Sequence, residues 1–374
     1  MLCLGLIGPL NMKITKQTKY LTTEDYQELF NKLIKDTTKG RRVQKSGKRI
    51  RTSTTDNYIY TQKLLIEYVE QTQNELRIYL INNLTTKEKE QAKKYYKKFF
   101  SDFTDFLYFK KDFYDNYVGL IVKSIRTFFN YLSSEHSLNV GEYHKQFYVP
   151  NEDIPIVVLS PEQLNYLISD AELEEKLPDS LKVIKDVFVF GCTVALRFSD
   201  LMSLKNENLL FYNDTYHLKV TSLKTTTNTT IKLPKYAIDI LKKYHKKQKT
   251  LIPAFSKSYL NKSFKKLGLQ LALKETMIKE RTKRGVKYPI YKNKAKRLHY
   301  TLADHITTHT MRRTAITNML RLGMPEQAVR KISGHSANSK EFFRYIELAQ
   351  LFIDEHTDKV FEKITQSKHS KREF

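Results

Sequence analysis

The chain has 374 residues, and its 65 Lys or Arg against 40 Asp or Glu give a formal net charge of +25 at pH 7. An excess of this size on a chain that is 40% hydrophobic indicates a folded protein with a polyanionic partner. Neither GxxxxGKS/T nor HExxH occurs, so nucleotide hydrolysis and zincin chemistry lack their usual signatures, and two cysteines, Cys3 and Cys192, exclude a disulfide framework and a zinc cluster.

Residues 1–55 combine an apolar start with one short helical pattern and a basic stretch. The run from Leu2 to Leu10 lacks a basic flank and is interrupted by Pro9, so it is too short to span a bilayer and is a poor signal peptide. Met12 begins a more ordinary start, and we expect the residues before it to have no structural role. The basic stretch from Lys39 to Arg51 leaves two interpretations open, a DNA-contacting arm and a solvated tail.

Three helical periods follow one another between residues 56 and 148. Apolar residues recur at steps of three and four, which predicts helices with one apolar face each that pack into a small all-α domain. We expect the aromatic residues among them to form the core rather than a surface for base stacking. The periods consist of Leu65, Tyr68, Val69, Leu76, Tyr79 and Leu80, then of Ala92, Tyr95, Tyr96, Phe99, Phe103, Phe106 and Leu107, and finally of Tyr117, Leu120, Ile121, Ile125, Phe128, Phe129 and Leu132.

A linker and a second domain follow. Residues 149–159 contain two prolines and show no period, so they are predicted to connect two domains. The second domain, over residues 160–364, begins at the capping box Ser160-Pro161-Glu162-Gln163 and precedes a basic C-terminal tail over residues 365–374. Its largely apolar segment from Leu181 to Ala195 predicts a buried helix.

The periodicity changes to two between Leu209 and Leu233. Runs rich in Val and Thr alternate there with turn residues, which predicts a three-stranded antiparallel sheet with Lys224 at the mouth of its second hairpin. The Lys- and Arg-rich stretch from Lys279 to Arg297 is predicted to be an exposed insertion. Glycine and proline are sparse, so helix should dominate, and the expected fold class is mainly α with a small antiparallel β-sheet.

Arginine and histidine recur near predicted helix ends. Arg197 follows the buried helix and needs an anionic partner, which a salt bridge to Asp200 or an anionic ligand would supply. His309 and Arg312 share one face at the start of a helix that Thr308 can cap, where free amides favour phosphate. A surface His and Arg in a basic protein explain this pair equally well. His305 and Arg313 lie at the wrong phase and are interpreted as bystanders.

Two further features lie near the C-terminus. Gly334-His335 ends the short helix begun at Pro325, and taken alone it indicates a helix stop followed by a surface histidine. Tyr345, the only tyrosine after Tyr300, lies among apolar residues at helical spacing. Taken alone it is interpreted as an amphipathic core residue.

Together, Arg197, Lys224, His309, Arg312, His335 and Tyr345, in this order and at these separations, resemble the active-site set of the tyrosine recombinase (phage integrase) family. The resemblance covers about Asp56 to Glu362. It implies a helical core DNA-binding domain over residues 56–148 and an α+β catalytic domain after the linker. One departure is visible, because the family's tyrosine commonly lies nine residues beyond the last histidine and Tyr345 lies ten beyond His335.

The resemblance also implies a chemistry. A site-specific recombinase of this family cleaves and rejoins DNA through a 3′-phosphotyrosyl intermediate without metal, ATP or another cofactor, here for integration or excision of a mobile element. By the resemblance, Tyr345 is the nucleophile, Arg197 and Arg312 hold the non-bridging phosphate oxygens, and His335 donates a further hydrogen bond. Lys224 matches the general acid for the leaving 5′ oxygen, and His309 assists as an acid or base.

The partners implied are double-stranded DNA and three further copies of the chain, as a homotetramer on two duplexes. Accessory DNA-bending proteins are compatible with the resemblance, and no membrane is expected. The expected location is the cytoplasm, with the nucleoid when the protein is bound to DNA. Two alternatives stay open: a catalytically silent DNA-binding protein of the same fold, and a DNA-relaxing enzyme similar to type IB topoisomerases.

Overall fold

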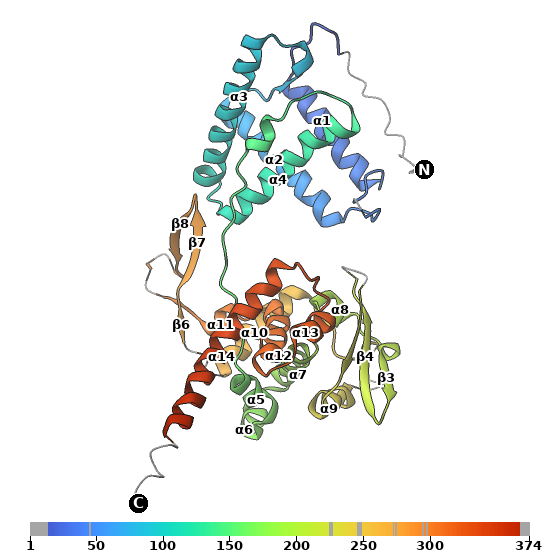
Figure 1. The fold of residues 1–374 in the computed structure, drawn as a ribbon, viewed down its shortest axis with the longest axis vertical. Helices are drawn as coiled ribbons and strands as arrows, with labels where there is room; N and C mark the ends of the chain where they lie inside the picture. Colours follow the sequence, from blue (N-terminus) through green and yellow to red (C-terminus); the bar gives the residue numbers. More distant parts are fainter. Residues whose placement is uncertain are drawn as a thin grey trace, which may run out of the picture. The chain divides into compact units, whose positions relative to one another are not determined.

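The chain divides into two units by its internal contacts. The first consists of the residues up to Ile154 together with Glu280–Ile290, and the second of Pro155–Lys279 together with the residues from Tyr291 onward. The computed structural model describes residues 14–44, 46–223, 227–244, 249–271, 273, 275–293, 295, 296 and 298–366. Helices predominate in both units and the strands form small two- and three-stranded sheets, which confirms the predicted fold class (Figure 1).

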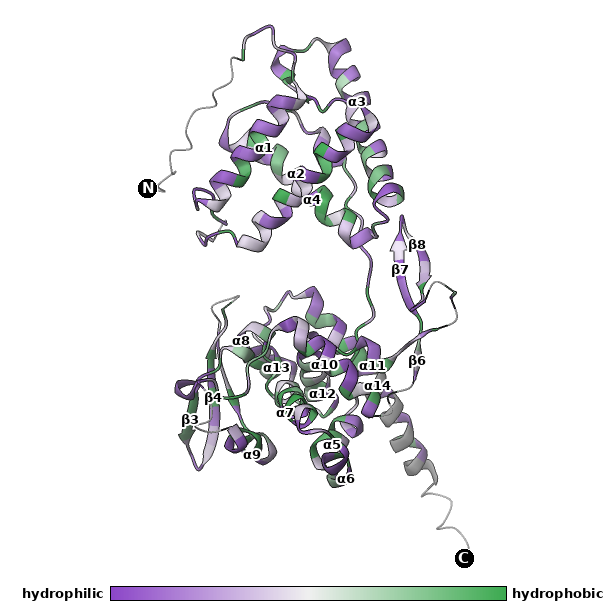
Figure 2. Cartoon of the chain, turned by 180° about the vertical axis from the view of Figure 1, so that it is seen from behind, coloured by the Kyte–Doolittle hydropathy of each residue, from purple (hydrophilic) through white to green (hydrophobic). Residues whose placement is uncertain are grey.

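Four α-helices build the described part of the first unit. They are α1 (Thr23–Thr38), α2 (Thr52–Thr72), α3 (Thr86–Asp105) and α4 (Asp115–Glu135), with a π-helical turn at Phe106–Lys110 and short 3-10 turns at Ile81–Asn83 and Tyr143–Gln146. These helices carry both apolar and polar residues (Figure 2), and the buried apolar residues of α1, Tyr26, Leu29, Phe30 and Leu33, recur at the spacing of one helix face. Most of the aromatic residues form the core as predicted, since Phe103, Phe128 and Phe129 are each at most 1% exposed, whereas Tyr117 is 43% exposed and lies outside the core.

Two segments of the first unit differ from the prediction. Helix α1 lies before residue 55, and its Leu29 and Phe30 are fully buried, so this part of the N-terminal segment is folded into the core and is not a free tail. The helix expected to reach Leu80 ends at Thr72, because Gln73 takes a left-handed conformation with φ 57°. The residues beyond it form β2 (Ile78–Tyr79), which pairs with β1 (Tyr20–Leu21).

The predicted insertion is a β-hairpin of β7 (Lys279–Lys283) and β8 (Val286–Ile290). Arg284 and Gly285 form its two-residue turn with φ of 50° and 79°, the geometry that matches strand twist. Their N–H groups donate to the buried Asp115 carboxylate at 2.8 and 3.1 Å, so the turn is anchored on the first unit rather than free. Ion pairs add to this anchor: Arg281–Glu152, Lys283–Asp112 and Arg284–Asp105.

The described part of the second unit consists of helices and two small antiparallel sheets. Its helices are α5 (Pro161–Ser169), α6 (Ala171–Lys176), α7 (Asp179–Val194), α8 (Phe198–Met202), α9 (Lys235–Tyr244), α10 (Lys257–Gln270), α11 (Leu302–His305), α12 (Thr308–Arg321), α13 (Glu326–Ser333) and α14 (Lys340–Gln366). Its strands are β3 (Leu209–Tyr212), β4 (Thr215–Thr221) and β5 (Asn228–Lys232) in one sheet, and β6 (Thr276–Met277) paired with β9 (Tyr300–Thr301).

Several predictions for this unit are confirmed. The Ser160 hydroxyl accepts from the Gln163 N–H and the Gln163 side chain accepts from the Ser160 N–H, which completes the predicted capping box. The predicted buried helix is α7, and the predicted sheet has antiparallel order β3-β4-β5. The cap of α12 differs, because its N-cap is Thr307 and not Thr308.

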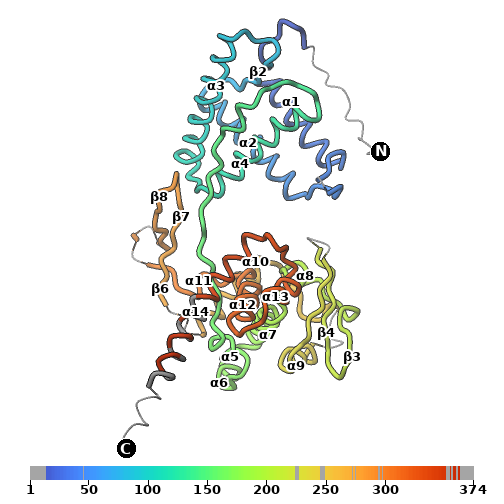
Figure 3. The backbone as a smooth tube through the Cα atoms, viewed as in Figure 1, coloured from blue at the N-terminus to red at the C-terminus, as the bar shows by residue number. Residues whose placement is uncertain are grey.

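Close packing places α12 between α7 and α14. A Cβ on Gly191 of α7 would lie 2.4 Å from Met311 Sδ of α12, so only glycine permits this approach. In Figure 3 the chain runs from α12 through α13 into the long α14. Helix α12 contacts both α14 and α7, although α7 lies far earlier in the sequence. No helix in the described part of the chain combines the length and apolar character that a bilayer crossing requires.

Candidate active site

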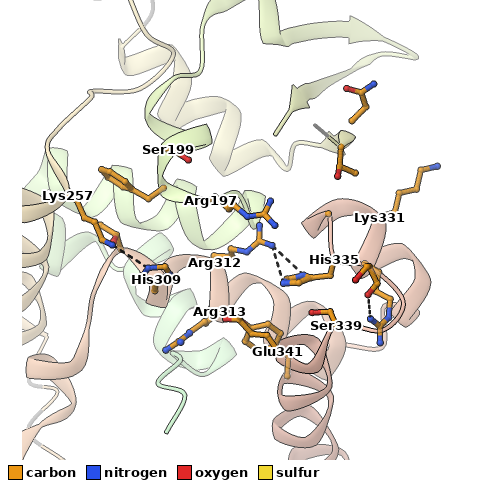
Figure 4. Close-up of a pocket in the computed structure, with 18 residues that line it drawn as sticks. Arg197, Ser199, Lys257, His309, Arg312, Arg313, Lys331, His335, Ser339 and Glu341 are labelled. Carbon is orange, nitrogen blue, oxygen red and sulfur yellow. Dashed lines mark hydrogen bonds between the residues drawn. The ribbon is translucent and has the colours of Figure 1, made fainter. Parts of the chain in front are cut away.

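Five of the six predicted site residues line one cavity of about 780 Å³ in the second unit. Arg197 lies at the start of α8, His309 and Arg312 lie in the first turns of α12, His335 follows α13, and Tyr345 is on α14. Figure 4 shows the Arg197, Arg312 and His335 side chains converging there. The sixth predicted residue, Lys224, lies outside the described residues.

Arg197 is held through a hydroxyl rather than through a direct salt bridge. The chain leaves α7 at Ala195, which has a left-handed φ of 53° and turns Arg197 toward the cavity. Arg197 Nη1 donates to Ser222 Oγ at 3.0 Å, and Ser222 Oγ donates to Asp200 Oδ2 at 2.9 Å. Asp200 is 2% exposed and thus supports Arg197 indirectly, while the charge of the guanidinium stays available to a ligand.

Arg312 is held by backbone carbonyls. Its Nη1 donates to the carbonyl of Ala195 at 2.7 Å and its Nη2 to the carbonyl of Ser333 at 2.6 Å. The guanidinium is 9% exposed, and its pKa falls to about 10 because burial and then the neighbouring Arg197 disfavour its charge. Among the described residues, the contacts of the Arg197 and Arg312 guanidiniums are to a hydroxyl, to backbone carbonyls and to His335, and none is an ion pair with a carboxylate. Both guanidiniums line the cavity, so together they can bind an anion there.

His335 faces the cavity and is not a surface histidine. Gly334 ends α13 in a left-handed conformation with φ 64°, which confirms the predicted helix stop and turns His335 inward. Its Nδ1 lies 2.8 Å from Ser333 Oγ, and its ring contacts that of Tyr345 with centroids 6.0 Å apart. Burial and then Arg312 lower the pKa of His335 to about 4, so the ring is neutral at pH 7 and remains a hydrogen-bond donor.

His309 lies at the other side of the cavity. Its Nε2 is 3.5 Å from Nζ of Lys257, the first residue of α10 (Figure 4). Shielding of the ring from water and then the charge of Lys257 lower the pKa of His309. A histidine kept neutral in this way can accept a proton during a reaction near pH 7.

Tyr345 is almost fully buried, with 1% of its surface exposed. Its hydroxyl donates to Glu341 Oε1 at 3.2 Å, one helical turn earlier on α14. Burial and then the Glu341 charge raise the pKa of Tyr345 to about 12, so the phenol is protonated at rest. Tyr345 therefore packs in a hydrophobic core cluster and also lines the cavity.

Sequence reasoning missed several residues of this cavity. Arg313, interpreted as a bystander, lines it, whereas His305 does not. Lys257 and Glu341 also line it, and neither carries a motif that distinguishes it from the many charged residues around it. The i,i+4 spacing of Glu341 and Tyr345 is the one sequence signal that would have found a contact here.

The chain is similar to known proteins in sequence and in fold. Residues 158–350, more than half of the chain, match the family model described as "Phage integrase family". A lambda integrase dimer bound to a COC′ core site matches with TM-score 0.56 at 13% identity, covering 90% of this chain and 82% of that chain. XerH site-specific recombinase in its post-cleavage complex with a palindromic difH substrate matches with TM-score 0.51 at 13% identity, covering 90% and 84%.

A third similar structure is a lambda integrase tetramer bound to a Holliday junction, with TM-score 0.55 at 12% identity over 88% of this chain and 78% of that chain. No curated protein sequence matches the chain. At these identities the structural likeness establishes the fold, and the family model covers the segment that carries the cavity. The chain is a member of the phage integrase family, the tyrosine recombinases.

Proposed function

We propose that the protein is a site-specific DNA recombinase that cleaves and rejoins strands through a 3′-phosphotyrosyl intermediate, in the integration or excision of a mobile element. The observation that carries this proposal is the pair of guanidiniums, Arg197 and Arg312, held without a carboxylate ion pair in a cavity that the buried Tyr345 hydroxyl adjoins. A phosphodiester is the anion of the right charge and size for this pair.

The reaction needs one bond to form and one to break at phosphorus. Tyr345 Oη attacks, the new bond joins phosphorus to the tyrosine oxygen, and the bond to the 5′ oxygen breaks. Arg197 and Arg312 stabilise the charge that develops on the non-bridging oxygens, and His335 adds a hydrogen bond from its neutral ring. Lys224 is proposed to protonate the leaving 5′ oxygen, and His309 to assist in proton transfer.

Metal and ATP are not required by this scheme. Two guanidiniums supply the charge stabilisation that metal ions supply in other phosphoryl-transfer enzymes. The phosphotyrosyl link keeps the energy of the phosphodiester, so a 5′ hydroxyl from a second strand can attack it and rejoin the DNA. Arg197 and Arg312 then serve both directions of the reaction.

Double-stranded DNA is the proposed substrate, and a homotetramer on two duplexes is the proposed assembly. Similar folds occur in a lambda integrase dimer on a core site and in a tetramer on a Holliday junction. We propose that the helices over residues 56–148 bind the duplex and that residues 160–364 carry the chemistry, with DNA-bending proteins as accessory partners. The net charge of +25 on the chain supports contacts with DNA phosphates.

A suicide substrate tests this proposal. A duplex site selected from random sequences by binding to the protein is nicked next to the scissile phosphate, so that the short 5′-hydroxyl fragment diffuses away after cleavage. Wild-type protein in EDTA should accumulate a covalent adduct in denaturing electrophoresis, and Tyr345→Phe should not. Binding without an adduct would favour the silent DNA-binding protein, and relaxation of supercoiled DNA without strand exchange would favour the topoisomerase.

A further inference from the structure

One carboxylate lines a cavity that is otherwise suited to an anion. Among the described lining residues six are Lys or Arg, and Glu341 is the only acidic one. A carboxylate in this position repels an incoming phosphodiester, so it weakens the binding that the arginines favour. Glu341 lies in the first turn of α14, where an acidic side chain stabilises the helix dipole. This role does not require a position in the cavity, since Glu326 has it at the start of α13 and does not line the cavity.

Glu341 has a specific contact in the cavity. Its Oε1 accepts the hydrogen bond from Tyr345 Oη at 3.2 Å, and this is the one hydrogen bond that the hydroxyl makes among the described residues. Phe342 and Tyr345 are at most 1% exposed, so this part of the helix is fixed and the hydroxyl direction is set. The proton on Oη therefore points at one acceptor.

Other acceptors near the hydroxyl are engaged elsewhere. The Nδ1 of His335 lies 2.8 Å from Ser333 Oγ, and its ring lies against the cationic Arg312. His309 Nε2 lies 3.5 Å from the Lys257 ammonium. Neither ring has a described hydrogen bond to Tyr345, so the geometry singles out Glu341.

We propose that Glu341 is the general base of strand cleavage and accepts the phenolic proton of Tyr345. As Oη attacks phosphorus, its O–H bond breaks, the proton moves to Glu341 Oε1, and the bond from phosphorus to the 5′ oxygen breaks. In resealing, protonated Glu341 returns the proton to the departing tyrosine oxygen. This inference rests on the proposed function, since it assigns a proton acceptor to the nucleophile of that reaction.

The charges around Tyr345 oppose one another. Arg312 and Arg313 face it from α12 and lower its pKa, whereas Glu341 raises it. His335 faces it from the loop after α13, and Arg330 of α13 lies over the Phe342 ring at 3.9 Å. Glu341 thus favours the protonated phenol at rest, and in the proposed step it takes the proton as the attack on phosphorus begins.

The test isolates the nucleophile side of the reaction. A suicide substrate with sulfur in place of the 5′ bridging oxygen has a leaving group that needs no acid, so a defect in Lys224→Ala is relieved on this substrate. Glu341→Gln keeps an oxygen that accepts the Tyr345 hydrogen bond but cannot take its proton. On the sulfur substrate its single-turnover cleavage should be slower at pH 7 by about 10²-fold, within the range for general-base catalysis.

The pH profile separates a base from a structural residue. The rate of wild-type cleavage of the sulfur substrate should depend little on pH above neutrality, because Glu341 takes the proton from the neutral phenol during the attack and no prior ionisation of Tyr345 is needed. Glu341→Gln cleavage should rise about tenfold per pH unit, since the reactive species is then the phenolate fraction. Added formate should accelerate Glu341→Ala and leave wild type unchanged. Glu347→Gln, an exposed position on the same helix, is the matched control and should behave as wild type.

The outcomes distinguish this inference from the proposed function. If wild type forms no adduct on either substrate, the proposed function fails. If wild type forms the adduct and Glu341→Gln cleaves at the same rate with the same pH profile, Glu341 is not the base and the proposed function stands. A uniform rate loss at every pH, with no response of Glu341→Ala to formate, would also overturn the proposed role and leave Glu341 as a structural residue.

Discussion

The substitution Arg197→Lys probes the anion site without changing its formal charge. Arg197 uses Nη1 to reach Ser222, and its other N–H groups have no partner among the described residues. A guanidinium can hold Ser222 and a phosphate oxygen together because its donors are fixed in one plane. A lysine ammonium at this position must bind one or the other with the same nitrogen.

The expected loss of cleavage rate follows from this arrangement of donors. Removing one preorganised donor from a site of this kind typically costs about 10² to 10³ in rate, or ~2.7 to 4 kcal/mol of transition-state stabilisation. We therefore expect single-turnover cleavage by Arg197→Lys to be slower by about that factor. The slope of log DNA affinity against log salt concentration should change by less than the amount that one phosphate contact contributes, because the positive charge is retained.

Single-turnover cleavage of the suicide substrate and binding titrations at several salt concentrations measure the two effects separately. Ser222→Ala is an informative partner, because it removes the support of Arg197 and should slow cleavage less than Arg197→Lys does. Cleavage by Arg197→Lys at the wild-type rate would remove Arg197 from the site. An equal loss of cleavage and binding would mean that the arginine is structural.

Three further predictions concern stability and packing. Asp115→Ala removes the acceptor of the Tyr108 hydroxyl and of the Arg284 and Gly285 N–H groups, so we expect unfolding free energy to fall by ~3 kcal/mol and hydrogen exchange at the hairpin turn to accelerate, with Lys287→Ala as control. Gly191→Ala places a methyl group 2.4 Å from Met311 Sδ and should lower the melting temperature by an amount equivalent to ~1 to 3 kcal/mol, whereas an unchanged melting curve would show that α7 and α12 can separate freely. The pKa of His335 is about 4 in the folded state, below its unfolded value of about 6.5, so protonation favours the unfolded state. The unfolding free energy of wild type should therefore decrease as the pH is lowered from about 6.5 to about 4. His335→Gln should make the unfolding free energy from chemical denaturation depend less on pH in this range.

Much of the fold follows from periodicity. The switch from a period of three or four to a period of two located the sheet of β3, β4 and β5, and the capping box at Ser160 located the start of α5. The pattern failed at Leu76 to Leu80, because a short strand buried on both faces has the same apolar residues as a helix. A short helical pattern was also visible before residue 55, but it did not show that this helix, α1, packs in the core, because basic residues follow it closely.

The site was harder to predict than the fold. Resemblance brought together Arg197, Arg312, His335 and Tyr345, and the structure places these residues on one cavity. Their supports depend on tertiary contacts that no local pattern encodes, such as the Ser222 hydroxyl between Arg197 and Asp200. The anchor of the hairpin turn on Asp115 is of the same kind, because it joins residues 169 positions apart.

The most direct measurement is the identity of the residue that becomes attached to DNA. After reaction of wild-type protein with the nicked site, nuclease and protease digestion followed by mass spectrometry identifies the modified peptide. We predict a nucleotide linked through its 3′ phosphate to Tyr345, and none when that residue is Phe. A link to any other residue, or cleaved DNA with no protein attached, would contradict the proposed mechanism.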